Sequence, residues 1–242
     1  MKIGTACGSN DLKMVPFFKK LNEEGLLDFL ELHIKPNITV RQVQQWREIF
    51  TKDNEFFVTH IHPENGDRGN YVEKYMNIAV DVSTICPFDS IVFDPGIVGD
   101  SFKGKEKNPK LSLEWILEEN MPYKTSFGDE CVSYMPSEMP CFFTFDISHA
   151  WITANQLKLD NRKLVKDFFD EMPQHFHVTD CKGETDHLLL GTGEIDWSYV
   201  VPLFPNDATI TIETDNITKT RKEDIVKDLT FFRRLCESYR PS

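Results

Sequence analysis

The sequence of 242 residues has no apolar run long enough to span a membrane. Its first residues, MKIGTACGS, also lack the basic stretch and apolar core of a secretory signal. It contains six cysteines, but no two of them have CxxC spacing, and a chain of this size does not depend on disulfides. We therefore expect a soluble, cytoplasmic protein with reduced thiols and no membrane partner.

Basic residues are also fewer than acidic residues. The chain has 27 Lys and Arg residues against 39 Asp and Glu residues, which gives a formal net charge of −12. Such a balance opposes broad binding of a phosphate backbone unless the basic residues cluster on one face, so nucleic acid is a disfavoured but not an excluded partner. Carboxylates gathered around a bound cation would account for part of the negative charge.

The first strand candidate and its turn lack the glycine-rich fingerprint of a dinucleotide-binding fold. Apolar stretches rich in β-branched and aromatic residues instead alternate with amphipathic helical stretches. They are KIGTA, LDFLELHI, EFFVTHI, DSIVFD, EWILEE, CFFTFD, HFHVTD and ATITIETD. Eight such units favour an α/β fold, a (β/α)₈ TIM barrel with a closed parallel sheet of eight strands, as a single domain over residues 1–242.

Helix boundaries are visible at Asn10, at Thr39 and at a capping box formed by Thr220 and Glu223. The crossovers after the fourth and fifth strands are less regular. The first is short for a βαβ unit, which needs roughly 30 residues or more, and the second, KTSFGDECVSYMPSEMP, is interrupted by proline. We predict shortened helices there, and an exposed barrel wall at this place would suit contact with a second copy of the chain.

Ionisable residues recur at the carboxyl ends of the strand candidates, which converge on one mouth of a barrel. The series is Glu31, His33, His60, His62, Asp94, Glu119, Asp146, His177 and Glu213. A single residue of this kind more often caps a helix or forms a turn, so the prediction depends on the series. Imidazole and carboxylate donors together suit Zn, Mn, Fe or Co, whereas the lack of thiolates argues against a structural zinc.

Some neighbouring residues compete for a place in the site. Only one of His175 and His177, which flank Phe176, is expected to face the barrel interior. Likewise only one of Glu118 and Glu119 can be a ligand, because adjacent strand residues point to opposite faces. His60 is favoured over His62, because Pro63 suggests that the strand ends there.

Five motifs in this order carry a resemblance to a known family. They are EENMP at 118–122, DISHAW at 146–151, FHVTD at 176–180, HLLLGTGEID at 187–196 and TIETD at 211–215. Together they make most of the chain similar to the xylose isomerase-like TIM barrel superfamily. That superfamily includes sugar and sugar-phosphate isomerases and epimerases and the endonuclease IV-type apurinic endonucleases.

The resemblance implies a divalent metal, Mn, Zn, Co or Fe, held by Glu119, Asp146, His177 and Glu213. It also implies that His149 contacts substrate or a further metal, and it matches His60 and His187 to family histidines. The candidate extra metal ligands are His60, Asp94, His149 and His187.

Three positions depart from the family patterns. Endonuclease IV proteins have a histidine where this chain has Asp94 and an aspartate where it has Thr185, which Asp186 could replace only if the loop shifts. The epimerases carry an arginine at the position of Gly183, for which Lys182 is a candidate replacement.

The leading hypothesis is a metal-dependent isomerase or epimerase of a small sugar, sugar phosphate or related polyol, acting through an enediolate. Glu119 and Glu213 would transfer the proton as the catalytic pair, and the substrate would be bound by His60, His149, His187 and Lys182. The first alternative is a zinc-dependent phosphodiester hydrolase of the endonuclease IV type. The second is a non-catalytic metal-binding barrel, because a fold alone does not establish an activity.

Overall fold

The computed structural model describes residues 1–8, 11–33, 39–47, 57–61, 90–93, 116–119, 142–213 and 221–239. For residues 40, 43, 47, 57–61, 90–91, 93, 116–119 and 142–143, the description covers the backbone alone.

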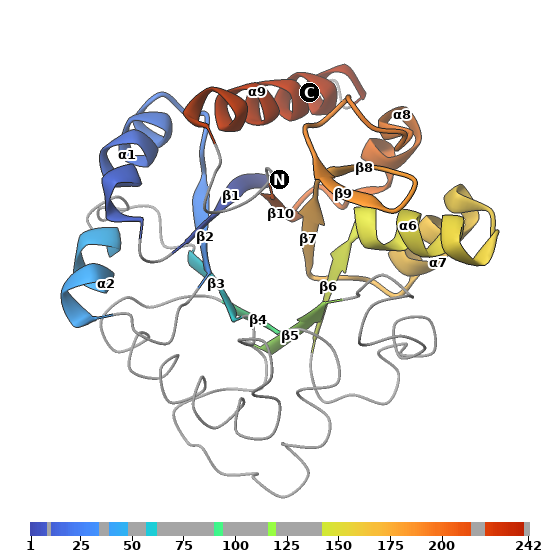
Figure 1. Ribbon diagram of the computed structural model, residues 1–242, viewed down its shortest axis with the longest axis horizontal. Coiled ribbons are helices and arrows are strands. Elements are labelled where there is room, and N and C mark those ends of the chain that lie inside the picture. Colours follow the sequence, from blue (N-terminus) through green and yellow to red (C-terminus); the bar gives the residue numbers. More distant parts are fainter. Residues whose placement is uncertain are drawn as a thin grey trace, which may run out of the picture.

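Parallel strands form the centre of the molecule (Figure 1). They are β1 (Lys2–Gly8), β2 (Phe29–His33), β3 (Phe57–Ile61), β4 (Ser90–Phe93), β5 (Ile116–Glu119), β6 (Phe142–Asp146), β7 (His175–Val178) and β10 (Thr209–Ile212). Each predicted strand segment overlaps one of them. Hydrogen-bonded neighbours follow the order β1-β10-β7-β6-β5-β4-β3-β2, and β2 pairs in turn with β1. The prediction of an α/β fold with a parallel central sheet is therefore confirmed.

Helices lie outside the ring of strands (Figure 1). They are η1 (Leu12–Met14), α1 (Val15–Glu23), α2 (Val40–Arg47), α6 (Ile147–Leu157), α7 (Asn161–Asp170), α8 (Trp197–Val200), η4 (Val201–Leu203) and α9 (Lys222–Tyr239). Thr39 caps α2 as predicted: its backbone N–H donates to Gln42 Oε1 at 2.9 Å, and the Gln42 N–H donates back to Thr39 Oγ1 at 3.3 Å. Among the helices described, none is long and apolar enough to cross a membrane.

The predicted shortening of the fourth and fifth crossover helices falls within residues 94–115 and 120–141, outside the described residues. The predicted cap residue Thr220 also lies outside them.

Strand β7 has one apolar face and one polar face. Phe176 and Val178 belong to the hydrophobic core, whereas His175 and His177 both contact Glu31 of β2. Strands β7 and β2 are separated by β10 and β1 in the sheet, so this contact crosses the barrel interior. The expectation that only one of the two histidines faces the interior is wrong, because residues two positions apart in a strand point to the same face.

An antiparallel hairpin, β8 (Asp180–Lys182) and β9 (Thr185–Leu188), follows β7 and was not predicted. The buried Asp180 carboxylate fixes the loop after it by accepting hydrogen bonds from the backbone N–H groups of Gly191 and Ile195 and from Trp197 Nε1. Gly193 passes so close that a Cβ there would lie 2.2 Å from Asp180 Oδ1. Gly193 is thus required for this close packing, and the hydrogen bonds to Asp180 hold the following loop against the hairpin.

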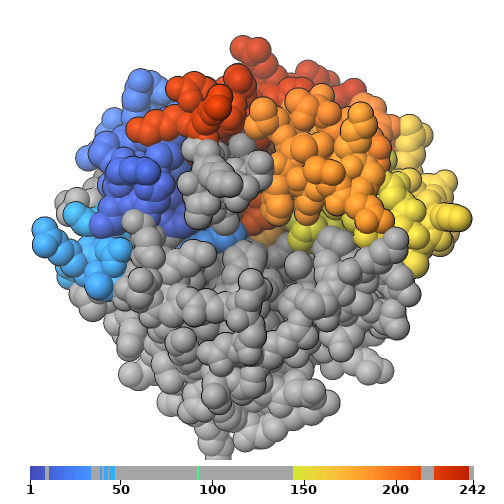
Figure 2. All heavy atoms as spheres, viewed as in Figure 1, coloured from blue at the N-terminus to red at the C-terminus, as the bar shows by residue number. Residues whose placement is uncertain are grey.

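The two ends of the chain meet on one side of the barrel. Arg233 of α9 donates from Nε to the Leu26 carbonyl at 2.9 Å and from Nη2 to Asp28 at 2.8 Å, at the start of β2. In Figure 2 the blue N-terminal segment and the red α9 accordingly occupy the same part of the surface. This packing attaches α9 to the start of β2, the strand that contributes Glu31 and His33 to the site.

Candidate metal centre

A polar cluster fills the barrel interior between β2, β7 and β10. At its centre is the carboxylate of Glu31, which is completely buried. Its Oε2 accepts a hydrogen bond from Thr211 Oγ1 at 2.5 Å and lies 3.1 Å from His175 Nε2. The His177 Nε2 atom lies 3.0 Å from Glu31 Oε1 and 3.1 Å from Oε2. Burying a carboxylate is costly unless its oxygens have polar partners, and here Oε2 is hydrogen-bonded while Oε1 lies close to the His177 ring.

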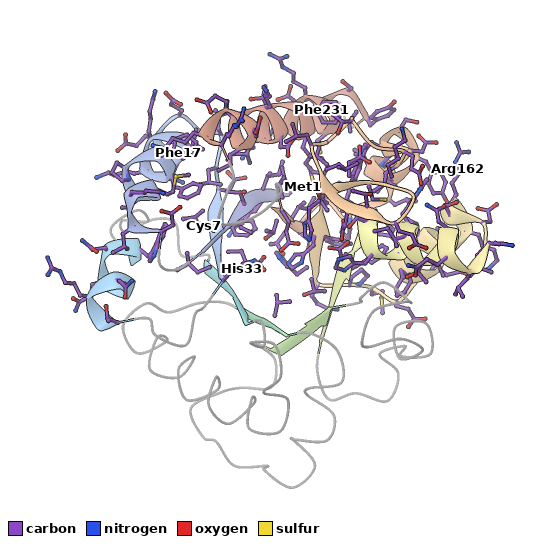
Figure 3. The ribbon with its side chains drawn as sticks, in the orientation of Figure 1. Met1, Cys7, Phe17, His33, Arg162 and Phe231 are labelled. Atoms are coloured by element: carbon purple, nitrogen blue, oxygen red, sulfur yellow. The ribbon has the colours of Figure 1, made fainter. Side chains whose placement is uncertain are left out.

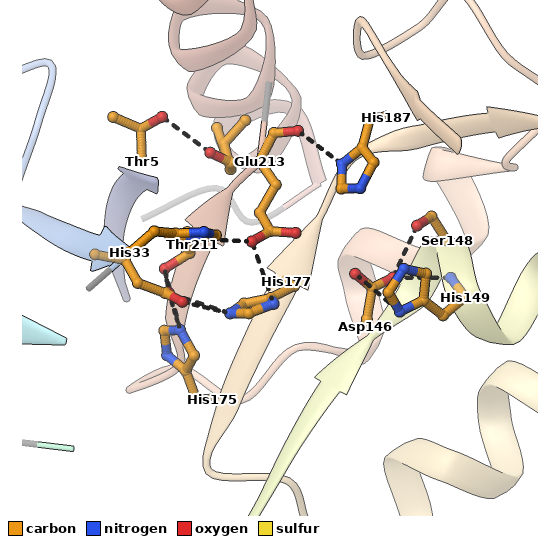
Figure 4. Close-up of polar contacts among 12 residues, drawn as sticks. Thr5, His33, Asp146, Ser148, His149, His175, His177, His187, Thr211 and Glu213 are labelled. Carbon is orange, nitrogen blue, oxygen red and sulfur yellow. Dashed lines mark hydrogen bonds and ion pairs between the residues drawn. The ribbon is translucent and has the colours of Figure 1, made fainter. Parts of the chain in front are cut away.

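The Glu31 carboxylate bears on which nitrogen of His177 carries the proton. With Glu31 ionised, its oxygens only accept hydrogen bonds, so His177 Nε2 would donate and the neutral ring would keep its lone pair on Nδ1. His177 Nδ1 faces Glu213, with 3.7 Å to Oε1 (Figure 4). A metal-binding histidine is commonly oriented in this way by a carboxylate on its other nitrogen.

Glu213 comes directly after β10 and joins the cluster to the barrel mouth. Its backbone N–H donates to the Val178 carbonyl at 3.1 Å, and its side chain is buried. Oxygen Oε1 lies 3.4 Å from His33 Nε2 at the end of β2 (Figure 4). One donor atom each of Asp146, His177 and Glu213 lie within 4.8 Å of one another, so three of the predicted metal ligands are brought together.

Asp146 has two roles because its two oxygens point differently. Oxygen Oδ1 accepts from the His149 backbone N–H at 2.8 Å and so caps α6, as the simpler interpretation of a strand-end aspartate predicts. Oxygen Oδ2 lies 3.6 Å from His149 Nδ1. The register pairs Asp146 with His177 on the neighbouring strand, which explains why both reach the same group.

A second group of donors lies next to the first. It consists of His149 at the start of α6 and of Asp186 and His187 on the hairpin strand β9. His149 Nε2 lies 2.9 Å from Asp186 Oδ2, and His187 Nε2 lies 3.8 Å from the same oxygen. Ser148 Oγ connects the two groups, at 2.8 Å from Asp146 Oδ1 and 2.7 Å from Asp186 Oδ1.

The backbone of His187 explains how two adjacent residues join one group. Its φ of 54° lies in the left-handed region, which a histidine seldom adopts. This breaks the alternation of a regular strand, in which Asp186 and His187 would point to opposite faces. Asp186 thus reaches His149. This is the loop position that Asp186 needs if it is to replace the aspartate that endonuclease IV proteins have where this chain has Thr185. Strained backbone of this kind concentrates at functional sites.

The charges in the second group are mutually stabilised. Burial alone would raise the pKa of Asp186, but attraction by His149 and a hydrogen bond to it outweigh burial and hold that pKa below its ordinary value. Partial burial would lower the pKa of His187, but Glu213 and Asp186 raise it above its ordinary value. Asp186 is therefore an ionised carboxylate, the form in which it could bind a metal.

The remaining predicted site residues are placed only in part. Glu119 and His60 end or nearly end β5 and β3, but their side chains lie outside the described residues, as does all of Asp94. The ligand roles of these three residues stay predictions. Lys182, Gly183 and Thr185 are exposed on the hairpin, and a substrate-binding role for Lys182 also stays a prediction.

The donor set suits a divalent transition metal. Each of the two groups combines imidazole nitrogens with carboxylate oxygens at separations that a cation could span. The metal ligands predicted from the sequence did not include Glu31, His33 or His175. Two of these, Glu31 and His33, carried the signal of lying at a strand end, and the third could have been found from its two-residue spacing to His177.

Comparison with known proteins supports the fold. No protein-family model matches the chain, and no curated protein does. Among solved structures, endonuclease IV from Thermus thermophilus is similar with a TM-score of 0.70 and 16% identity, over 98% of this chain and 100% of that one.

Two further structures are similar. The structure named AsfvAP:AG has a TM-score of 0.65 and 13% identity, over 97% of this chain and 98% of that one. A dipeptide epimerase from Methylococcus capsulatus, complexed with a Mg ion, has a TM-score of 0.50 and 7% identity, over 89% of this chain and 56% of that one. The resemblance inferred from the motifs is thus confirmed at the level of the fold.

Proposed function

We propose that this chain is a metal-dependent phosphodiester hydrolase of the endonuclease IV type, built on a (β/α)₈ barrel, that cleaves nucleic acid at abasic sites. The observation that carries the proposal is that two groups of metal-donor residues lie next to each other. The first group is Asp146, His177 and Glu213, and the second is His149, Asp186 and His187. The isomerase hypothesis uses a single metal site, whereas two or more metals that clamp a phosphate suit phosphodiester hydrolysis. The fold similarity to endonuclease IV over nearly all of both chains supports the same hypothesis.

The residues of the site have separable tasks in this proposal. Asp146, His177 and Glu213 would hold one metal, and His149, Asp186 and His187 a second, with Glu119 as a further ligand from β5. Metals bound there would polarise the phosphate and make a bound water more acidic. Ser148 contacts both Asp146 and Asp186, and so keeps the two groups at a fixed separation.

The net charge of −12 does not contradict this function, since bound cations supply the positive field that a phosphate needs. The same charge does favour the isomerase and epimerase hypothesis, in which Glu119 and Glu213 transfer a proton on a small, uncharged sugar. That hypothesis is the second candidate, with the first donor group as its metal site.

A cleavage assay separates the two candidates. We expect zinc-loaded protein to cut a DNA duplex that carries one abasic-site analogue, because such cleavage needs both donor groups. Asp186→Asn should reduce the rate at least 100-fold, whereas the exposed Asp207→Asn serves as the matched control and should retain the rate. Absence of cleavage, together with solvent deuterium entering a carbon-bound position of a ketose, would overturn the proposal in favour of the isomerase.

A further inference from the structure

We propose that His33 is an additional metal ligand, which binds a cation together with Glu213 on the β2 side of the centre. The inference rests on the metal centre of the proposed function and extends it to β2, a strand that contributes no residue to the predicted ligand set. The class of ligand is a divalent transition metal, because the donors are an imidazole nitrogen and a carboxylate oxygen.

The separation of the two donor atoms is the first support. His33 Nε2 lies 3.4 Å from Glu213 Oε1. A charge-assisted hydrogen bond between such groups is shorter, at about 2.7–2.9 Å. Two ligands of a tetrahedral zinc, each about 2.0–2.1 Å from the metal, stand about 3.3 Å apart. The observed separation fits two ligands of one metal better than a direct hydrogen bond.

Position in the sheet is the second support. His33 is the last residue of β2, and its side chain is only 2% exposed. The register pairs it with His60 of β3, the residue predicted for the site, so the two residues lie at the same level of the barrel. Figure 3 shows His33 inside the ring of strands, and Figure 4 shows its side chain in contact with the Glu213 carboxylate.

Glu31 lies close to both proposed ligands but has other contacts. One donor atom each of Glu31, His33 and Glu213 lie within 4.8 Å of one another. However, the Glu31 oxygens are already in contact with Thr211, His175 and His177. We therefore assign Glu31 a positioning role and leave His33 and Glu213 as the ligands of this cation.

Nuclear magnetic resonance of cadmium-loaded protein tests the proposal directly. Protein with ¹⁵N-labelled histidine is loaded with ¹¹³Cd²⁺, and the ring nitrogens are searched for coupling to the metal. We expect coupling to Nε2 of His33, assigned by the loss of that signal in His33→Gln. His175→Gln is the matched control, because this buried ring contacts Glu31 and Thr209 instead and its loss should leave the His33 coupling in place.

The outcomes separate this proposal from the proposed function. Coupling to His177 and His149 without coupling to His33 would overturn the His33 assignment alone. Coupling to His33 in protein that fails to cut abasic DNA would support the assignment and count against the hydrolase. No coupling at any histidine would overturn both. If His33→Gln does not fold, the His33 ring signal is assigned in the wild-type protein by through-bond correlation with the His33 backbone, and the coupling is read from that spectrum.

Discussion

Replacing Glu31 with glutamine should weaken metal binding without removing a metal ligand. The carboxylate is completely buried and contacts Nε2 of His177, which leaves Nδ1 of that ring facing Glu213. A glutamine side chain has the same shape, but its amide can also donate. Where it donates to His177 Nε2, the ring proton moves to Nδ1 and blocks the atom that would bind the metal.

The expected size of the effect follows from comparable outer carboxylates, whose loss lowers metal affinity about 10- to 100-fold. This corresponds to about 1.4–2.8 kcal/mol of binding free energy. Zinc affinity is measured by competition with a chromophoric chelator, and circular dichroism checks that the variant is folded. Glu23→Gln, on the exposed side of α1, is the control and should bind zinc like the wild type. An affinity of Glu31→Gln within twofold of the wild type would refute this account of His177.

Three further predictions concern stability and reactivity. Gly193→Ala should cost about 1–3 kcal/mol, or roughly 2–4 °C in Tm per kcal/mol, because its Cβ would lie 2.2 Å from Asp180 Oδ1. Gly183→Ala has nothing within 4 Å and carries only the strain of its positive φ of 62°, so it should lose less, and equal losses would contradict the packing argument. Cys7 and Cys181 should resist alkylation at pH 8 in native protein, since burial raises the pKa of both thiols, and rapid labelling of either by peptide mass spectrometry would be inconsistent with that burial. Removal of the metal with a chelator should lower Tm, because a metal that binds only the folded protein stabilises it by about 2.7 kcal/mol when the free metal concentration is 100 times Kd. An unchanged Tm in calorimetry would argue against a metal bound to the folded protein.

The strands could be predicted from the sequence because their signal is local. Each apolar segment carries its own β-branched or aromatic residues, and each of the eight overlaps a strand of the sheet. The carboxyl ends of parallel strands then bring Asp146, His177 and Glu213 together, as the series of ionisable residues indicates.

The rest of the centre depends on features that a pattern does not carry. The place of Asp186 requires the left-handed backbone of His187 in an unpredicted hairpin. The place of Glu31 depends on contacts across the barrel interior with His175 and His177. Glu31 and His177 both belong to the predicted series, but the sequence carries no signal that they contact each other, and this contact becomes visible only once the sheet order is known.

The central claim is that the two donor groups hold separate metals, and metal content tests it most directly. Protein purified without chelator is analysed by inductively coupled plasma mass spectrometry, alongside Asp186→Asn and the control Asp207→Asn. We predict at least two metals per chain in the wild type and the control, and one fewer in Asp186→Asn. A single metal per chain in all three proteins would contradict the account.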